Sequence, residues 1–447
     1  MARGIRNERL AALLTEAQWN SAELARAIVA MGRAQGFAIS YDRTAPAHWL
    51  NGTRPRPPTP QLAAEVFTKR LRRLVTASDT GLIDEVRVPG QLHDPRQAAT
   101  GPVETVQELV MLCRAALDPA HGPALARGLY AAPLAPPTVW TVPRTPPSSL
   151  TSHAGALVLG DLARTLSSMW TRYGGGQTRP LLLSYVAHST RPEYMSEHPG
   201  LLAGYAKFAY LAAVTCGDCG QHGMAQQLFH AALRLSRFAG ARELGAVTLR
   251  AISSHALYLN YGDQAAEAAE AAVDLATSQA SGAIRSFVLA QRAVTFAARG
   301  QSAEAARDVE LMVHTWDEGS GRPGPFTTYP RSAMDFQRSQ VWRLLGEKKR
   351  AQQALHEALR ERSPVQRRPY ALLHAALAEL ACEEGRLDVA CRHWATFLDH
   401  YPYVWSTALL HALARMSSRL APFADQQKIS RLLGKAAALG ADSQWRQ

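Results

Sequence analysis

From about residue 150 onward, apolar positions recur with a helical period in one segment after another. Five of these segments end near a glycine, and each glycine precedes an alanine-rich segment: Gly220, Gly262, Gly300, Gly346 and Gly385. The glycines recur at intervals of about 40 residues, near the period of two-helix solenoid repeats. We predict that each glycine supplies the left-handed cap of a first helix and that the alanines let a second helix approach it closely. The pattern favours a tetratricopeptide-like α-solenoid, with an irregular helical bundle as the alternative.

The first 76 residues contain shorter apolar segments that predict four helices. The first covers residues 7–16, and Asn20 or Ser21 caps the second. A loop from Gly32 to Asp42 follows, longer than the three or four residues usual in a helix-turn-helix. Thr44 can cap a third helix that ends at Leu50, and a fourth covers residues 61–74. We therefore expect a helix-turn-helix domain over residues 1–76.

Residues 77–149 have a different character. Val103–Leu117 is a plausible helix, whereas Ala132–Pro147 contains six prolines and reads as a stiff linker. The expected division is therefore a helix-turn-helix domain (1–76), a helical connector with a Pro-rich linker (77–149) and a repeat domain (150–447). All regular structure is predicted to be α-helical.

Charge is concentrated at the N-terminal end. The chain has a net charge of +12, and residues 1–75 hold twelve Lys/Arg against five Asp/Glu, a surplus of seven. A compact basic segment is typical of a nucleic-acid binder. No apolar run reaches membrane-spanning length and no signal peptide is apparent, so we expect a cytoplasmic protein without membrane contact.

Catalytic motifs are absent from the sequence. It has no dinucleotide fingerprint, no nucleophile elbow and no His-Glu-x-x-His motif, so we expect no enzyme and no cofactor. Cys216 and Cys219 have half the spacing of a zinc site, but no second close pair follows, and small-residue packing is the preferred interpretation. Three consecutive glycines, Gly174 to Gly176, predict a helix break.

The predicted third helix carries the candidate DNA contacts. A recognition helix presents its N-terminal residues to base edges in the major groove, while Trp49 and Leu50 would face inward. Arg43 can donate two hydrogen bonds to guanine, and Thr44 or Ala45 can meet a thymine methyl group. Beyond the helix, the prolines around Arg54 and Arg56 keep that segment extended, so its guanidinium groups could reach phosphates. The candidate DNA-binding residues are Arg43, Thr44, Ala45, Ala47, His48, Arg54 and Arg56.

A second candidate region lies in the repeat domain. The first helix of each pair lines the concave surface of a solenoid, and polar or aromatic side chains there could hold a small molecule or peptide. The residues on those helices are Tyr205, Phe208, Tyr210, His255, Tyr258, Asn260, Gln291, Arg292, Gln337, Arg338 and Trp342. They define a region rather than a site.

Several stretches resemble a known family of proteins. They are Leu24–Ala27, Tyr41–Thr44, His48–Pro57, Tyr173–Pro180 and Gly220–Gln226. The combination resembles actinobacterial regulators that join an Xre-type (lambda-repressor-like) helix-turn-helix to a tetratricopeptide body. This resemblance implies a transcription regulator, often of developmental or secondary-metabolite genes.

The expected mechanism combines the two ends of the chain. A homodimer formed through the body would place two heads on an inverted-repeat operator in double-stranded DNA. A small molecule or peptide in the body would shift operator affinity, because it would bind one of two conformations of the protein more tightly than the other. The alternative is a tetratricopeptide scaffold that binds and regulates another protein without binding DNA.

Overall fold

The computed structural model shows helical structure at both ends of the chain. Every regular element among the residues that it describes is an α-helix or a 3-10 helix, and these residues include no strand. The predicted all-α fold is therefore confirmed. The described residues are 6–34, 37, 39–56, 58–71, 75, 79–82, 101–118, 122–126, 130, 140, 150–189, 198–316, 326 and 328–443.

Two compact units make up the chain, and each is described by itself. The first, which we call the head, contains residues 1–98, 118–134 and 220–226, and the second, the body, contains the remainder. Apart from Trp140, the Pro-rich stretch 132–147 lies outside the described residues. The predicted domain limits at residues 76 and 149 stay a prediction.

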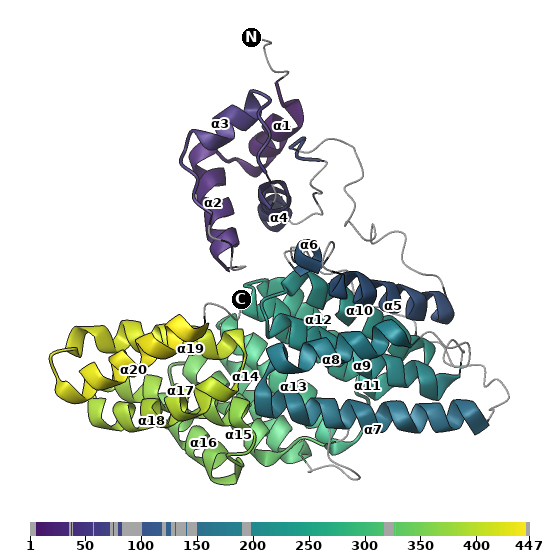
Figure 1. Ribbon diagram of the computed structural model, residues 1–447, viewed down its shortest axis with the longest axis vertical. Helices are drawn as coiled ribbons and strands as arrows, with labels where there is room; N and C mark the ends of the chain where they lie inside the picture. The colour runs from purple at the N-terminus through teal and green to yellow at the C-terminus, as the bar shows by residue number, and fades with distance from the viewer. Residues whose placement is uncertain are drawn as a thin grey trace. The chain divides into compact units, whose positions relative to one another are not determined.

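The head has four helices that share one core: α1 (Glu8–Ala17), α2 (Ser21–Ala34), α3 (Ala45–Leu50) and α4 (Thr59–Leu71) (Figure 1). Fully buried side chains of this core come from α1, α2 and α4, and the two on α2 lie four positions apart, as the apolar pattern requires. They are Leu10, Leu24, Ile28, Leu62 and Phe67. The head also contains α6 (Gly122–Ala126).

Side-chain caps fix where the first two helices begin. The Asn7 side chain accepts a hydrogen bond from the backbone N–H of Leu10 at 3.0 Å. Asn20 and Glu23 form a reciprocal capping box, with distances of 3.0 Å from Glu23 N to Asn20 Oδ1 and 2.7 Å from Asn20 N to Glu23 Oε2. Of the two caps predicted for α2, the structure therefore selects Asn20.

The second helix runs further than the sequence predicted. Gly32 was expected in a loop but is helical, and α2 ends at Ala34. The reason is a close approach: a Cβ on Gly32 would collide with the side chain of Ile39, which folds back over the helix. The glycine is thus needed for packing and not for a turn.

The body is a series of antiparallel helix pairs (Figure 1). Packing is most extensive within consecutive pairs, such as α11 with α12 and α13 with α14, and α13 also packs on α11 and α15. Contacts within each pair, and between the first helix of one pair and the first helix of the next, are typical of a solenoid. The helices are α5 (Pro102–Leu117), α7 (Leu150–Tyr173), α8 (Gly175–His188), α9 (Pro199–Gly217), α10 (His222–Phe238, in the body from Gln227 on), α11 (Arg242–Tyr258), α12 (Gly262–Leu275), α13 (Gly282–Ala298), α14 (Ser302–Thr315), α15 (Arg331–Leu344), α16 (Lys348–Glu361), α17 (Arg367–Glu383), α18 (Leu387–His400), α19 (Thr407–Leu420) and α20 (Gln427–Ser443).

Left-handed residues end the first helices, as predicted, with one exception. Four of the five predicted glycines have φ between 72° and 79°: Gly220, Gly300, Gly346 and Gly385. At the remaining turn Asn260 (φ 66°) takes the left-handed position, and Gly262 instead begins α12. Asparagine tolerates this conformation better than other residues with a side chain.

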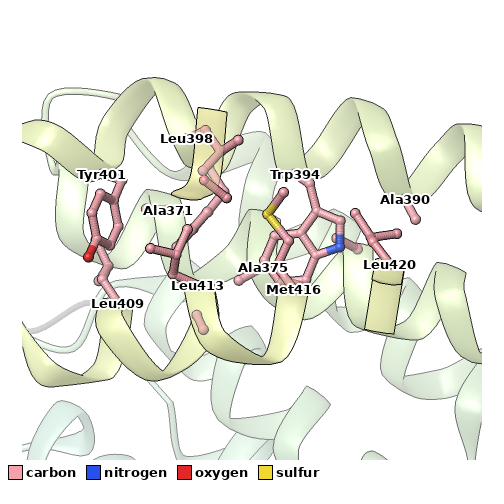
Figure 2. Close-up of a cluster of buried hydrophobic side chains, with 14 of the residues drawn as sticks. Ala371, Ala375, Ala390, Trp394, Leu398, Tyr401, Leu409, Leu413, Met416 and Leu420 are labelled. Atoms are coloured by element: carbon pink, nitrogen blue, oxygen red, sulfur yellow. The ribbon is translucent and has the colours of Figure 1, made fainter. Parts of the chain in front are cut away.

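The last four helices bury a large apolar cluster. Trp394, Phe397 and Leu398 of α18 are fully buried, as are Leu409 and Met416 of α19. Figure 2 shows Trp394 in the middle of this cluster with Ala375, Met416 and Leu420 around it. Alanines on α17 and α18 let the helices approach each other closely around these larger side chains.

A buried junction around Asp218 joins segments that are distant in sequence. The Asp218 carboxylate accepts hydrogen bonds from Gly175 N (2.9 Å), Trp170 Nε1 (3.2 Å) and Ser406 Oγ (2.6 Å). It also forms a bidentate ion pair with Arg368 at the start of α17, with a shortest distance of 2.7 Å. We call these residues the Asp218 junction.

The triple glycine lies against this junction. The predicted helix break is present at Gly174 (φ 80°), but it does not extend over all three glycines, because Gly175 and Gly176 form the first turn of α8. A Cβ on Gly174 or Gly176 would collide with Trp405, and one on Gly175 with the backbone carbonyl of Thr215. The three glycines are therefore explained by close packing.

Candidate nucleic-acid interface

The side chain that caps the third helix lies two positions before the one that the sequence predicted. Thr44 occupies the N-cap position but makes no side-chain cap bond. Instead, Asp42 Oδ1 accepts hydrogen bonds from Thr44 N (3.0 Å), Thr44 Oγ1 (2.7 Å) and Ala45 N (3.2 Å). The Thr44 hydroxyl bond is the main cause of the lowered pKa of the Asp42 carboxyl. Asp42 therefore fixes the orientation in which α3 starts.

Trp49 holds the same helix against the head. Its side chain is 4% exposed and meets the Tyr41 ring edge to face, with centroids 5.2 Å apart. The Tyr41 hydroxyl in turn lies 2.7 Å from Thr59 Oγ1 at the start of α4. The expectation that Trp49 faces inward is confirmed, whereas Leu50 is only half-buried.

The opposite side of α3 faces solvent. Arg43, Thr44, Ala47 and His48 are exposed, while Ala45 is half-buried. The four exposed residues line an open depression of about 500 Å³. Its other lining residues are Asn51 and the first residues of α2: Asn20, Ser21 and Ala22.

The depression therefore combines two kinds of polar group. Arg43 and His48 contribute side-chain donors, and the N-terminal end of α2 contributes backbone N–H groups and the positive end of a 14-residue helix dipole. Such a surface is suited to an anionic, hydrogen-bonding partner. A nucleic-acid backbone next to base edges is a partner of this kind.

The arginines after α3 extend this exposed basic region. Arg54 and Arg56 are both exposed, and residues 53–56 have no regular secondary structure. Further along, Arg70 donates a hydrogen bond from Nε to Ala17 O at 3.0 Å and lies over the Trp19 ring, so it caps α1. Arg72 and Arg73, which follow α4 in the sequence, lie outside the described residues.

In the body, the aromatic ligand candidates on α9 lie in the core. Tyr205, Phe208 and Tyr210 are at most 4% exposed, and Phe208 stacks on Tyr185 with centroids 4.9 Å apart. Packing accounts for these side chains. Trp342 is half-buried under Arg350, whose guanidinium lies 4.9 Å from the ring centroid.

The polar ligand candidates on α13 and α15 have local partners. Gln291 is 2% exposed and lies within hydrogen-bond distance of Ser253 and Thr295. Arg292 forms a bidentate ion pair with Asp308 of α14, with distances of 2.7 and 2.8 Å. Arg338 bonds Asp335 at 2.6 Å and Glu357 of α16 at 3.2 Å, and Gln337 on the same helix is half-buried.

The candidates near the end of α11 are the more accessible ones. Tyr258 is 49% exposed, and its hydroxyl lies 3.0 Å from Nδ1 of His411 on α19. His255 is half-buried beside the Phe229 ring, and Asn260 is the left-handed cap described above. The structure does not gather the candidates into one site, and the ligand region stays a prediction.

Three further findings concern metal ions, thiols and membrane spans. Within it, no group of three or more His, Cys, Asp or Glu side chains is placed to hold a metal ion. Burial raises the pKa of the Cys216 thiol and raises that of Cys219 to about 12, so both thiols stay protonated at neutral pH. No helix in the described ranges is long and apolar enough to cross a membrane.

Comparisons with known proteins add little to this description. The family model described as the SP15 N-terminal domain matches residues 10–83, which include most of α1 and all of α2 to α4. No curated protein matches the chain. The chain is similar to the crystal structure of the APC/C hetero-tetramer Cut9-Hcn1, with 13% identity and a TM-score of 0.35, over 95% of this chain and 68% of that one. A TM-score this low carries no argument about fold or function.

The sequence reading missed two residues that shape the depression or the body. Asp42 sets the start of α3, and Asp218 is the centre of its junction. An acidic residue three positions before a helix was a readable cap signal for Asp42. Nothing local marks Asp218, because its partners are distant in sequence.

Proposed function

We propose that the chain is a sequence-specific DNA-binding transcription regulator, similar to the Xre-type regulators, that reads DNA with α3 of the head. The observation that carries the proposal is the common exposure of Arg43, Thr44, Ala47 and His48 around one depression. They belong to a segment with a surplus of seven positive charges, which attracts a polyanion.

The contacts divide into two kinds. Arg43 is suited to a guanine edge and the methyl groups of Thr44 and Ala47 to thymine, and these contacts would specify sequence. The N-terminal end of α2, with Arg54 and Arg56, would position the head on phosphates. The buried Trp49 and the cap from Asp42 hold α3 in a fixed orientation, which direct reading of bases requires.

The body would provide dimerisation and sensing. Two copies joined through their bodies would bring two heads to the half-sites of an inverted repeat. A bound small molecule or peptide would then change operator affinity by the difference between its affinities for the two forms of the dimer.

The test is selection of bound sequences from random double-stranded DNA, followed by titration at several salt concentrations. The variant Arg43→Ala, His48→Ala should lose about 1–3 kcal/mol per base contact and its sequence preference. Arg33→Ala is the matched control, because this exposed arginine lies at the other end of α2 and outside the depression.

The outcomes separate the two functions considered. Enrichment of one sequence, lost in the double variant and kept in Arg33→Ala, supports the regulator. If the wild-type chain enriches no sequence, with or without cell extract as a source of effector, the scaffold that binds another protein becomes the better account.

A further inference from the structure

Among the buried hydrogen-bond donors of the body that have no acceptor, three belong to one cluster. They are Nε of Arg250 on α11, the hydroxyl of Tyr329 just before α15, and Nε of Arg362 just after α16. None of the three atoms has a hydrogen-bond partner among the described residues. Buried donors of this kind are uncommon in folded proteins and need an explanation, such as a bound ion or ligand.

Ring contacts link Arg250 to Tyr329, and the charges of both arginines act on the Tyr329 phenol. Burial raises the pKa of the Tyr329 phenol, and the positive charges of Arg250 and Arg362 oppose that rise. The Arg250 guanidinium lies over the Phe287 ring, 4.3 Å from its centroid, and this ring is 4.8 Å from that of Tyr329. Tyr329 is 2% exposed, whereas Arg250 and Arg362 are half-buried and so remain accessible.

No described carboxylate is committed to these arginines. Burial lowers the pKa of Arg250, and the groups that oppose this are the phenols of Tyr210 and Tyr329. Arg362 has a lowered pKa for the same reason, and its Nη1 donates to Gln366 at 2.9 Å. The carboxylate whose charge acts on the pKa of the Tyr329 phenol is that of Asp335.

Asp335 is already neutralised by other side chains. It is fully buried and accepts hydrogen bonds from Arg331 at 3.2 Å and Arg338 at 2.6 Å. The cluster of Arg250, Tyr329 and Arg362 thus carries two positive charges, and three of its donors have no acceptor among the described residues. A partly desolvated guanidinium without a counter-ion is unfavourable, and an oxyanion would supply both the charge and the acceptor atoms.

We propose that Arg250, Tyr329 and Arg362 bind the oxyanion group of a small ligand, a carboxylate or a phosphate, with the Phe287 ring beside it. The guanidinium groups would each donate to the anion, and the phenol would add a neutral donor from the buried side. This assignment does not depend on DNA binding by the head. It identifies a charge class of ligand for the body.

Titration calorimetry of the full-length chain without DNA tests the assignment. The probes are inorganic phosphate and succinate, each compared with sodium chloride at equal ionic strength. We expect at least one probe to bind with a stoichiometry of one per chain. Binding of phosphate alone assigns a phosphate ligand, and binding of succinate alone a carboxylate ligand. If neither probe binds beyond the chloride control, the proposal is wrong.

Two variants and a control locate the binding. Tyr329→Phe removes a hydroxyl that bonds nothing in the fold, so it should not lower the thermal stability of the unliganded chain while it weakens binding roughly tenfold. Arg250→Met should weaken binding roughly tenfold to a hundredfold. The control Arg343→Met breaks the ion pair with Glu379, so it should lower stability and leave affinity unchanged. Unchanged affinity in both Tyr329→Phe and Arg250→Met, or an equal loss in Arg343→Met, would overturn the assignment.

Discussion

Replacing Asp218 by asparagine should destabilise the body strongly. Asparagine keeps the shape of the side chain but removes the charge, and Arg368 then has no counter-ion at the junction. The Asp218 side chain is 2% exposed and that of Arg368 is 19% exposed, so solvent compensates little for the loss.

The size of the effect follows from this burial. Breaking a buried ion pair by removing one partner typically costs about 3–5 kcal/mol. We expect about 3 kcal/mol, the lower end, because the Arg368 guanidinium remains partly exposed and keeps its contact with the Trp170 ring at 4.9 Å. Asp399→Asn is the matched control: its partner Lys435 is 2.7 Å away, but the two side chains are 66% and 48% exposed. An exposed pair of this kind contributes about 0–1 kcal/mol.

Urea denaturation followed by tryptophan fluorescence is the appropriate assay, because Trp170 donates a hydrogen bond to the Asp218 carboxylate. The double variant Asp218→Asn, Arg368→Met should recover part of the loss, since it removes the unpaired charge as well. The reasoning would be refuted if Asp218→Asn lost no more stability than Asp399→Asn, or if the double variant were the sum of its single variants.

Three further predictions concern other parts of the chain. Burial lowers the pKa values of His374 and His393 to about 4, and their Nδ1 atoms are 3.0 Å apart. As the pH falls, the unfolded state therefore takes up protons before the folded state does, so the stability of the body should be full above about pH 6.5 and fall toward pH 4. The urea midpoint measured against pH should show this fall, and the fall should be smaller in His374→Phe. Trp394→Ala should cost about 3–5 kcal/mol in the same denaturation assay, because it empties the centre of the last apolar cluster; a loss below 1 kcal/mol would show that the helices close around the gap. Asn20→Ala removes one half of the capping box with Glu23 and should lower the stability of the head by about 1 kcal/mol, measured by denaturation of the full-length chain; an unchanged head transition would contradict the cap assignment.

The helical repeats could be predicted because their determinants are local. A left-handed residue after each first helix and alanines in the following one can be read directly from the sequence. The exception at residue 260 is also local: Asn260 occupies the position that Gly300 occupies in the next pair, two residues after the helix ends. The nearby Gly262 gave the stronger sequence signal but takes the first position of α12 instead.

Long-range partners could not be predicted in the same way. Asp218 bonds Arg368 and Ser406, which are 150 and 188 positions away. Arg292 was considered for ligand contact because its partner Asp308 becomes visible only when the register of α13 against α14 is known. On the head, by contrast, the exposed face of α3 followed from its six-residue length and from Trp49, which must be buried.

The Asp218 junction has a consequence for how the body unfolds. A linear array of repeats can fray from either end, since each repeat depends only on its neighbours. Here Asp218, in the turn after α9, bonds Arg368 at the start of α17 and Ser406 just before α19. The last helices of the body therefore cannot separate from α9 without breaking a contact that spans most of the array. The body should therefore unfold more cooperatively than its repeat architecture suggests. Folding should also be slower, because that contact closes a loop of about 150 residues.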